Sequence, residues 1–127
     1  MQDLIKDFLA QRRFAVCGSF RNESKPAYRI LKTLKEKDHE VFPVNPRLEE
    51  VMGISCYRSV KGIPGGVDVA DIVTPPGITE KIVMECREAG IGRVWMQPGA
   101  ESEKAINFCR QNNIKVLHGV CVMMESL

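Results

Sequence analysis

A chain of 127 residues is of ordinary size for one domain, and its contents of 44% hydrophobic and 27% charged residues exclude a disordered or fibrous protein. The formal net charge of +2 is too small to indicate a nucleic-acid-binding surface, so any bound anion must be held locally. The five cysteines are widely spaced and form no CxxC pair, which argues against a disulfide framework and against structural zinc.

In chain order, the apolar pattern predicts a helix over residues 3–11, a strand over 14–17, a helix over 26–37 and a strand over 40–44. It continues with a strand over 67–73, a helix over 78–89, a strand over 92–97, a helix over 101–112 and a strand over 115–118. In the segment 48–63, Cys56 and Tyr57 form either a short edge strand or a packed loop. This alternation predicts a doubly wound α/β fold, with a mainly parallel five-stranded sheet and helices on both faces.

The amino-terminal residues 1–13 carry charges among their apolar positions and lack the core of a signal peptide. No run approaches the ~20 apolar residues that a membrane helix needs. The sequence contains no repeat and no linker long enough to divide it. We therefore expect a single domain over residues 1–127, in the cytoplasm, with no membrane or nucleic-acid partner.

The loop after the first predicted strand has the composition of an anion site. In an open sheet of this kind, ligands bind outside the carboxyl ends of the strands, near the point where the strand order reverses. Gly18 permits close approach of the backbone, Ser19 offers a hydroxyl, and Arg21 and Lys25 add positive charge before a helix. A pyrophosphate suits this loop. The alternative is that Gly18 only forms a tight turn, Ser24 only caps the helix and both cations are solvated.

The end of the second predicted strand discriminates between nucleotides. NAD-binding folds place an Asp or Glu here to hold the ribose hydroxyls, whereas this strand ends in Asn45, Pro46 and Arg47. An arginine matches the oxygens of a ribose phosphate, as in NADP or coenzyme A (CoA). The sequence therefore disfavours NAD, unless Asn45 and Pro46 only turn the chain away from the sheet.

Ordered motifs extend over residues 14–124: AVCGS at 15–19, SKPAY at 24–28, VFPVNPR at 41–47, WMQPG at 95–99 and CVM at 121–123. In this order and spacing the chain resembles the small CoA-binding-domain family, the YccU-like proteins related to the amino-terminal domain of the succinyl-CoA synthetase α subunit. The resemblance implies a Rossmann-like fold with CoA across the strand ends. The chain departs from many relatives after the third strand, where Thr74-Pro75-Pro76 replaces a charged Arg-Pro-Glu.

The resemblance also implies which residues hold CoA. Those expected at the phosphates are Gly18, Ser19, Arg21 and Lys25, together with the adjacent Phe20 and Pro26. Those expected at the adenosine and its ribose phosphate are Asn45, Pro46 and Arg47. The adenine or pantetheine path is expected along Val73, Thr74 and Pro75, and the thiol end near Gln97, Gly99 and Cys121.

Other chemistry-bearing residues receive structural assignments. His39 lies at the amino end of a strand and is expected at a surface turn, and His118 lies at the correct end but lacks an evident carboxylate partner. Cys86, Cys109 and Trp95 are expected in the core. We predict no catalytic residue and no metal ligand.

The predicted function is a small cytosolic protein that binds CoA or acyl-CoA without catalysis of its own. Two alternatives remain from the sequence. One is an enzyme, either an NADP-using oxidoreductase or a relative of the acyl-CoA synthetases. The other is a regulatory domain that binds a different nucleotide.

Overall fold

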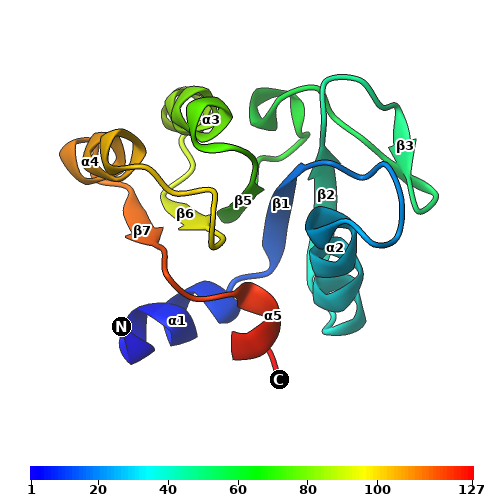
Figure 1. Ribbon diagram of the computed structural model, residues 1–127, viewed down its shortest axis with the longest axis horizontal. Helices are drawn as coiled ribbons and strands as arrows, with labels where there is room; N and C mark the ends of the chain where they lie inside the picture. The colour runs from blue at the N-terminus through cyan, green and yellow to red at the C-terminus, as the bar shows by residue number, and fades with distance from the viewer.

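The computed structural model describes all 127 residues. A parallel sheet of five strands forms its centre, in the order β2-β1-β5-β6-β7 (Figure 1). The strands are β1 (Arg13–Gly18), β2 (Glu40–Val44), β5 (Val69–Val73), β6 (Arg93–Met96) and β7 (Lys115–Leu117). The chain moves from β1 outward to β2 and then returns to the other side of β1 to form β5. The strand order therefore reverses between β1 and β5, as in a doubly wound sheet.

Helices cover both faces of the sheet, as the sequence predicted (Figure 1). On one face lie α1 (Gln2–Leu9), α2 (Pro26–Glu36) and α5 (Val122–Glu125), and on the other α3 (Pro76–Glu88), α4 (Glu103–Gln111) and the 3₁₀ helix η1 (Val60–Gly62). Each face has its own cluster of 15 buried hydrophobic residues. Successive residues of β1 contribute to opposite clusters, because side chains alternate across a strand.

Local sequence explains where three of the helices begin. Pro26 and Pro76 begin α2 and α3, where the missing N–H of proline costs no hydrogen bond. The Ser102 hydroxyl accepts a hydrogen bond from the Ala105 N–H at 3.0 Å and caps α4. Ser24, by contrast, does not cap α2. Its hydroxyl donates to the Asn22 side chain, and the N-cap position of α2 belongs to the next residue.

The segment 48–63 contains structure that the sequence pattern did not resolve. A short antiparallel hairpin joins β3 (Glu50–Val51) to β4 (Ile54–Ser55) through Met52 and Gly53, both with positive φ. Tyr57 then forms an isolated parallel bridge to Val44, which extends the sheet edge beyond β2 by a single residue. The helix α5 was also not predicted. No helix of the chain combines the length and apolar character needed to cross a bilayer.

Candidate ligand-binding site at the strand ends

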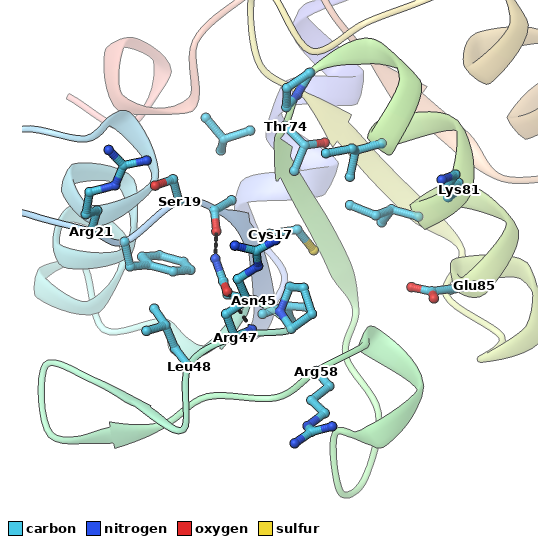
Figure 2. Close-up of a pocket in the computed structure, with 18 residues that line it drawn as sticks. Cys17, Ser19, Arg21, Asn45, Arg47, Leu48, Arg58, Thr74, Lys81 and Glu85 are labelled. Atoms are coloured by element: carbon cyan, nitrogen blue, oxygen red, sulfur yellow. Dashed lines mark hydrogen bonds between the residues drawn. The ribbon is translucent and has the colours of Figure 1, made fainter.

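A cavity of about 760 Å³ opens at the carboxyl ends of β1, β2 and β5, where the strand order reverses (Figure 2). The loops after these three strands and one face of α3 form its walls, which are mainly apolar. Ten residues that the sequence assigned to a ligand line it: Gly18, Ser19, Phe20, Arg21, Asn45, Pro46, Arg47, Val73, Thr74 and Pro75. Residues from three distant parts of the chain thus meet in one hollow, of the size typical of small-molecule sites.

Gly18 is needed for packing as well as for the loop. A Cβ atom at this position would lie 2.7 Å from the Ala27 Cβ of α2 and 3.1 Å from the Val73 carbonyl oxygen of β5. The close approach that the sequence attributed to a ligand is therefore made first by the neighbouring helix and strand. Because α2 packs so tightly on β1, the Ser19 and Arg21 loop is held at the cavity mouth (Figure 2).

Asn45 joins the two loops on which Arg21 and Arg47 lie. Its side-chain amide donates to the Gly18 carbonyl oxygen at 2.8 Å, and its carbonyl oxygen accepts from the Arg47 N–H at 2.9 Å (Figure 2). Its backbone N–H donates to the Tyr57 carbonyl oxygen at 2.9 Å. Asn45 is thus more than a turn residue, since it fixes the position of the second loop relative to the first.

The loop after β5 is anchored to α3. The Thr74 hydroxyl lies 2.8 Å from the hydroxyl of the fully buried Thr79 on the first turns of the helix. This pair holds the Thr74 and Pro75 wall of the cavity at a fixed distance from the helix face behind it.

Four cationic side chains line the cavity: Arg21, Arg47, Arg58 and Lys81. All four residues are exposed, and none of them forms a salt bridge. The lining contains a single carboxylate, Glu85. An apolar interior rimmed by unpaired cations favours a ligand with an apolar body and several negative charges.

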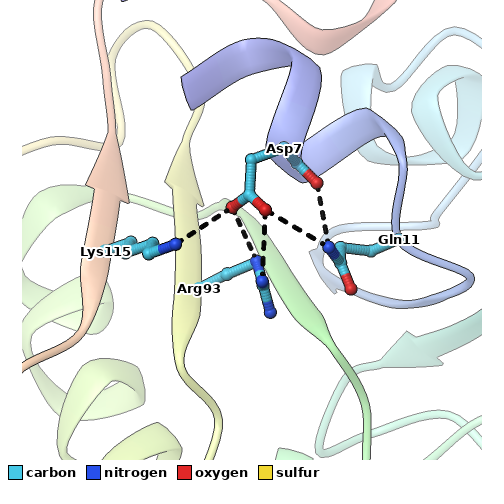
Figure 3. Close-up of polar contacts among 4 residues, drawn as sticks. All are labelled: Asp7, Gln11, Arg93 and Lys115. Carbon is cyan, nitrogen blue, oxygen red and sulfur yellow. Dashed lines mark hydrogen bonds and ion pairs between the residues drawn. The ribbon is translucent and has the colours of Figure 1, made fainter. Parts of the chain in front are cut away.

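Charges at the opposite, amino-terminal edge of the sheet are paired with one another. Asp7 of α1 accepts hydrogen bonds from the Arg93 guanidinium at 2.9 and 3.2 Å, and Lys115 Nζ lies 3.5 Å from the same carboxylate (Figure 3). The hydrogen bond from Arg93 is the main reason that the pKa of Asp7 falls below its ordinary value. Arg13 likewise forms an ion pair with Glu40.

Several lining residues were not predicted from the sequence. Ile78, Lys81, Ile82 and Glu85 occur at positions i, i+3, i+4 and i+7 of α3, which place them on one helix face. The signal was therefore present in their spacing. Arg58 directly follows the residue that bridges to Val44, so it too emerges at the carboxyl edge of the sheet.

Four residues that the sequence assigned to a ligand do not line this cavity and are not fully buried. Lys25 occupies the N-cap position of α2, followed by Pro26. Gly99 follows β6 with φ of 95°, and its N–H donates to the Glu101 carboxylate at 3.2 Å. Cys121 is half-buried at the start of α5. The structure therefore does not gather the whole predicted set into one hollow.

Gln97, the remaining predicted residue, is buried, and its side chain forms hydrogen bonds within the protein. Its amide donates to Asp71 Oδ1 at 2.7 Å, and its carbonyl oxygen accepts from the Val122 N–H at 3.0 Å. Asp71 is fully buried, and its second oxygen has no hydrogen-bond partner. Burial raises the pKa of Asp71 to about 8, against the opposing effect of the Gln97 hydrogen bond. Together with the bond from Trp95 Nε1 to the Val120 carbonyl oxygen at 3.0 Å, Gln97 holds the carboxyl-terminal segment against the sheet.

Three of the remaining cysteines, the tryptophan and one histidine are packed within the protein. Burial raises the pKa of Cys17, on the cavity wall, well above its usual value, so this thiol is protonated. Cys86 and Cys109 are buried in the core as predicted, as is Trp95. His39 is packed rather than free at the surface, because its ring lies edge-on against Phe14 with centroids 4.5 Å apart.

Comparisons with known proteins identify the family. A model of the CoA binding domain matches residues 12–126. The α subunit of an ADP-forming acetate–CoA ligase II of Pyrococcus furiosus is 33% identical over 126 residues, covering 91% of this chain and 28% of that subunit. The uncharacterized protein YneT of Bacillus subtilis is 25% identical, covering 93% of this chain and 88% of its own length.

Solved structures share this fold. A conserved hypothetical protein of Pyrococcus furiosus has a TM-score of 0.85 at 41% identity, covering 90% of this chain and 98% of that one. The chain spans only 14% to 28% of the first three ligases that it matches, so the activity of those longer proteins does not follow from the likeness. Because the family model matches nearly the whole chain and the sheet has the order described above, the protein belongs to the CoA binding domain family, with a Rossmann-like fold.

Proposed function

We propose that the cavity binds coenzyme A or an acyl-CoA. The observation that carries this proposal is the placement of Arg21 and Arg47 at the mouth of an apolar hollow, beside the Gly18 and Ser19 backbone. Neither arginine forms a salt bridge with the protein. Free guanidinium groups bind phosphate oxygens in bidentate geometry, and CoA carries both a diphosphate and a ribose phosphate.

In the proposed arrangement, the diphosphate lies at Ser19 and Arg21 and the ribose 3′-phosphate lies at Arg47. The adenine enters the apolar part of the cavity. The pantetheine arm leaves along Thr74 toward the ends of β6 and β7, where Gly99 and Cys121 lie. Gln97 does not contact the ligand in this arrangement, because both ends of its side chain are already hydrogen-bonded.

Membership in the family supports CoA as the ligand. The relative from Pyrococcus furiosus is named as a CoA ligase subunit, and the matching model is that of a CoA binding domain. For this chain we propose binding without catalysis of its own, in the cytoplasm.

Arg47 also favours a second candidate, NADP, because that dinucleotide carries a ribose phosphate as well. The two ligands differ in the group beyond the diphosphate. Direct comparison of their binding separates them, and NAD and dephospho-CoA complete the comparison because each lacks the ribose phosphate.

The test is the thermal stability of the protein with each of these four ligands at equal concentration. A ligand present at 100 times its dissociation constant adds about 2.7 kcal/mol of stability. We expect CoA to raise the melting temperature most, dephospho-CoA less, and NADP and NAD least. Equal shifts from CoA and NAD would refute the proposed role of Arg47, and a larger shift from NADP would favour the second candidate.

A further inference from the structure

The wall of the cavity that α3 forms has a different character from the loops opposite. Ile78 and Ile82 give it an apolar surface, and Lys81 and Glu85 flank that surface on the same helix face. Across the hollow lies the loop after β2, where Figure 2 labels Asn45 and Arg47, and Pro46 of this loop also lines the cavity. Two apolar walls that face each other across a slot suit a flat aromatic ring, whose faces are apolar and whose edge carries polar groups.

Glu85 is the exception in this site. It is the single carboxylate among lining residues that include four cations, and it is half-buried. It takes part in none of the salt bridges of the chain. The nearby Lys61 pairs instead with Glu88 at 2.9 Å. Figure 2 shows the Glu85 carboxylate directed from α3 toward the loop after β2.

A carboxylate in this position opposes the binding of a polyanion unless the ligand gives it a hydrogen bond. Its charge also acts on the cavity wall: burial is the main cause of the raised pKa of Cys17, followed by Cys86 and Asp71, and Glu85 makes a smaller contribution. A hydrogen-bond donor on the ligand would offset this cost, and the apolar walls described above favour a donor at the edge of a flat ring. In CoA, the exocyclic amino group of adenine meets that requirement.

We propose that Glu85 determines base specificity by accepting a hydrogen bond from the adenine amino group, with the ring held between Pro46 and Ile82. This inference rests on the proposed function, and it adds a recognition element that the phosphate contacts do not supply. Phosphate-binding cations accept any nucleotide of suitable charge, whereas an acceptor placed at the ring edge selects for a purine with a donor at its 6-position.

The test compares CoA with its analogue in which unsubstituted purine replaces adenine, so that only the amino group is lost. Dissociation constants are measured by isothermal titration calorimetry. For the wild type we expect CoA to bind at least roughly tenfold more tightly than the analogue, as for a hydrogen bond to a charged group. In Glu85→Ala the two ligands should bind equally. Glu85→Gln, which retains an acceptor oxygen, should restore a preference of only a few-fold.

Two variants on the same helix provide the controls. Lys81→Met removes a lining charge, so it should raise both dissociation constants by the same factor and leave their ratio unchanged. Glu88→Gln removes a carboxylate one turn away that does not line the cavity, and it should leave the ratio of the two dissociation constants as in the wild type. These variants separate loss of charge from loss of the acceptor.

Equal binding of CoA and the analogue by the wild type would overturn this inference and leave the proposed function intact. A preference that persists in Glu85→Ala would also overturn it. If the wild type binds no CoA, the proposed function fails and this inference fails with it. The melting temperature of each variant shows whether a change in the ratio comes from the site or from loss of the fold.

Discussion

Charged side chains are paired at one edge of the parallel sheet and unpaired at the other. At the amino-terminal edge, Asp7 contacts Arg93 and Lys115 (Figure 3). Arg13 contacts Glu40 at the same edge. At the carboxyl-terminal edge, Arg21 and the other cations that line the cavity form no salt bridge (Figure 2). Charges that are paired within the protein serve its structure, whereas charges left unpaired around a hollow are available to a ligand.

The difference follows from the topology. Helix α1 precedes β1 and lies across the amino ends of β6 and β7, so its Asp7 can reach the first residues of both strands. At the other edge each strand leads into a loop, and the loops separate around the point where the strand order reverses. The same fold thus closes one edge and leaves the other open.

The largest expected effect concerns the interior between the two edges. The pKa of Asp71 is about 8 in the folded protein and near 3.8 when unfolded, so between these values only the folded chain holds the proton. Stability should therefore fall as pH rises from about 4 to 8, by about 1.4 kcal/mol per unit in the limiting case. Asp71→Asn removes this dependence.

We expect Asp71→Asn to match the wild type near pH 4 and to exceed its free energy of unfolding by more than about 2 kcal/mol at pH 7. Guanidinium denaturation at several pH values measures the difference. A variant that is less stable than the wild type at pH 7 would show that the carboxylate is ionised and stabilised in the fold, contrary to its environment.

The next effect distinguishes the edges directly. Arg47→Ala should weaken the binding of CoA by about 1.5–3 kcal/mol, because a charge-assisted contact to the ribose phosphate is lost. The binding of dephospho-CoA should weaken much less. Asp7→Asn, the matched change at the other edge, should lower stability without altering either dissociation constant. If Arg47→Ala weakens the binding of CoA and dephospho-CoA equally, this arginine lies at the diphosphate instead. If neither affinity changes, Arg47 does not contact the ligand.

The sequence predicted the parts of the site that are local to strand ends. Gly18, Asn45 and Thr74 directly follow apolar runs, and parallel strands bring such residues to one edge. The contribution of α3 was not predicted, because the pattern of Ile78 and Ile82 alone does not distinguish a helix face that packs from one that lines a hollow. Only the placement of the helix on the sheet decides this.

Other differences have equally physical causes. Gln97 follows the end of β6, where side chains normally meet solvent, but the buried Asp71 on the adjacent strand provides it with a partner inside. The hairpin of β3 and β4 was not predicted because strands of two residues carry no periodicity. The signal available in the sequence was Gly53, which favours the positive φ of 75° found in the turn.

The most direct test of the account is to locate bound CoA by the backbone amide shifts of ¹⁵N-labelled protein during a titration. We expect the largest shifts at Ser19, Arg21 and Arg47, at the open edge of the sheet. The chemical shifts of amides near Arg13 and Arg93, at the closed edge, should not change. Shifts concentrated at the closed edge, or no shift at millimolar CoA, would contradict the claim that the unpaired cations form the binding site.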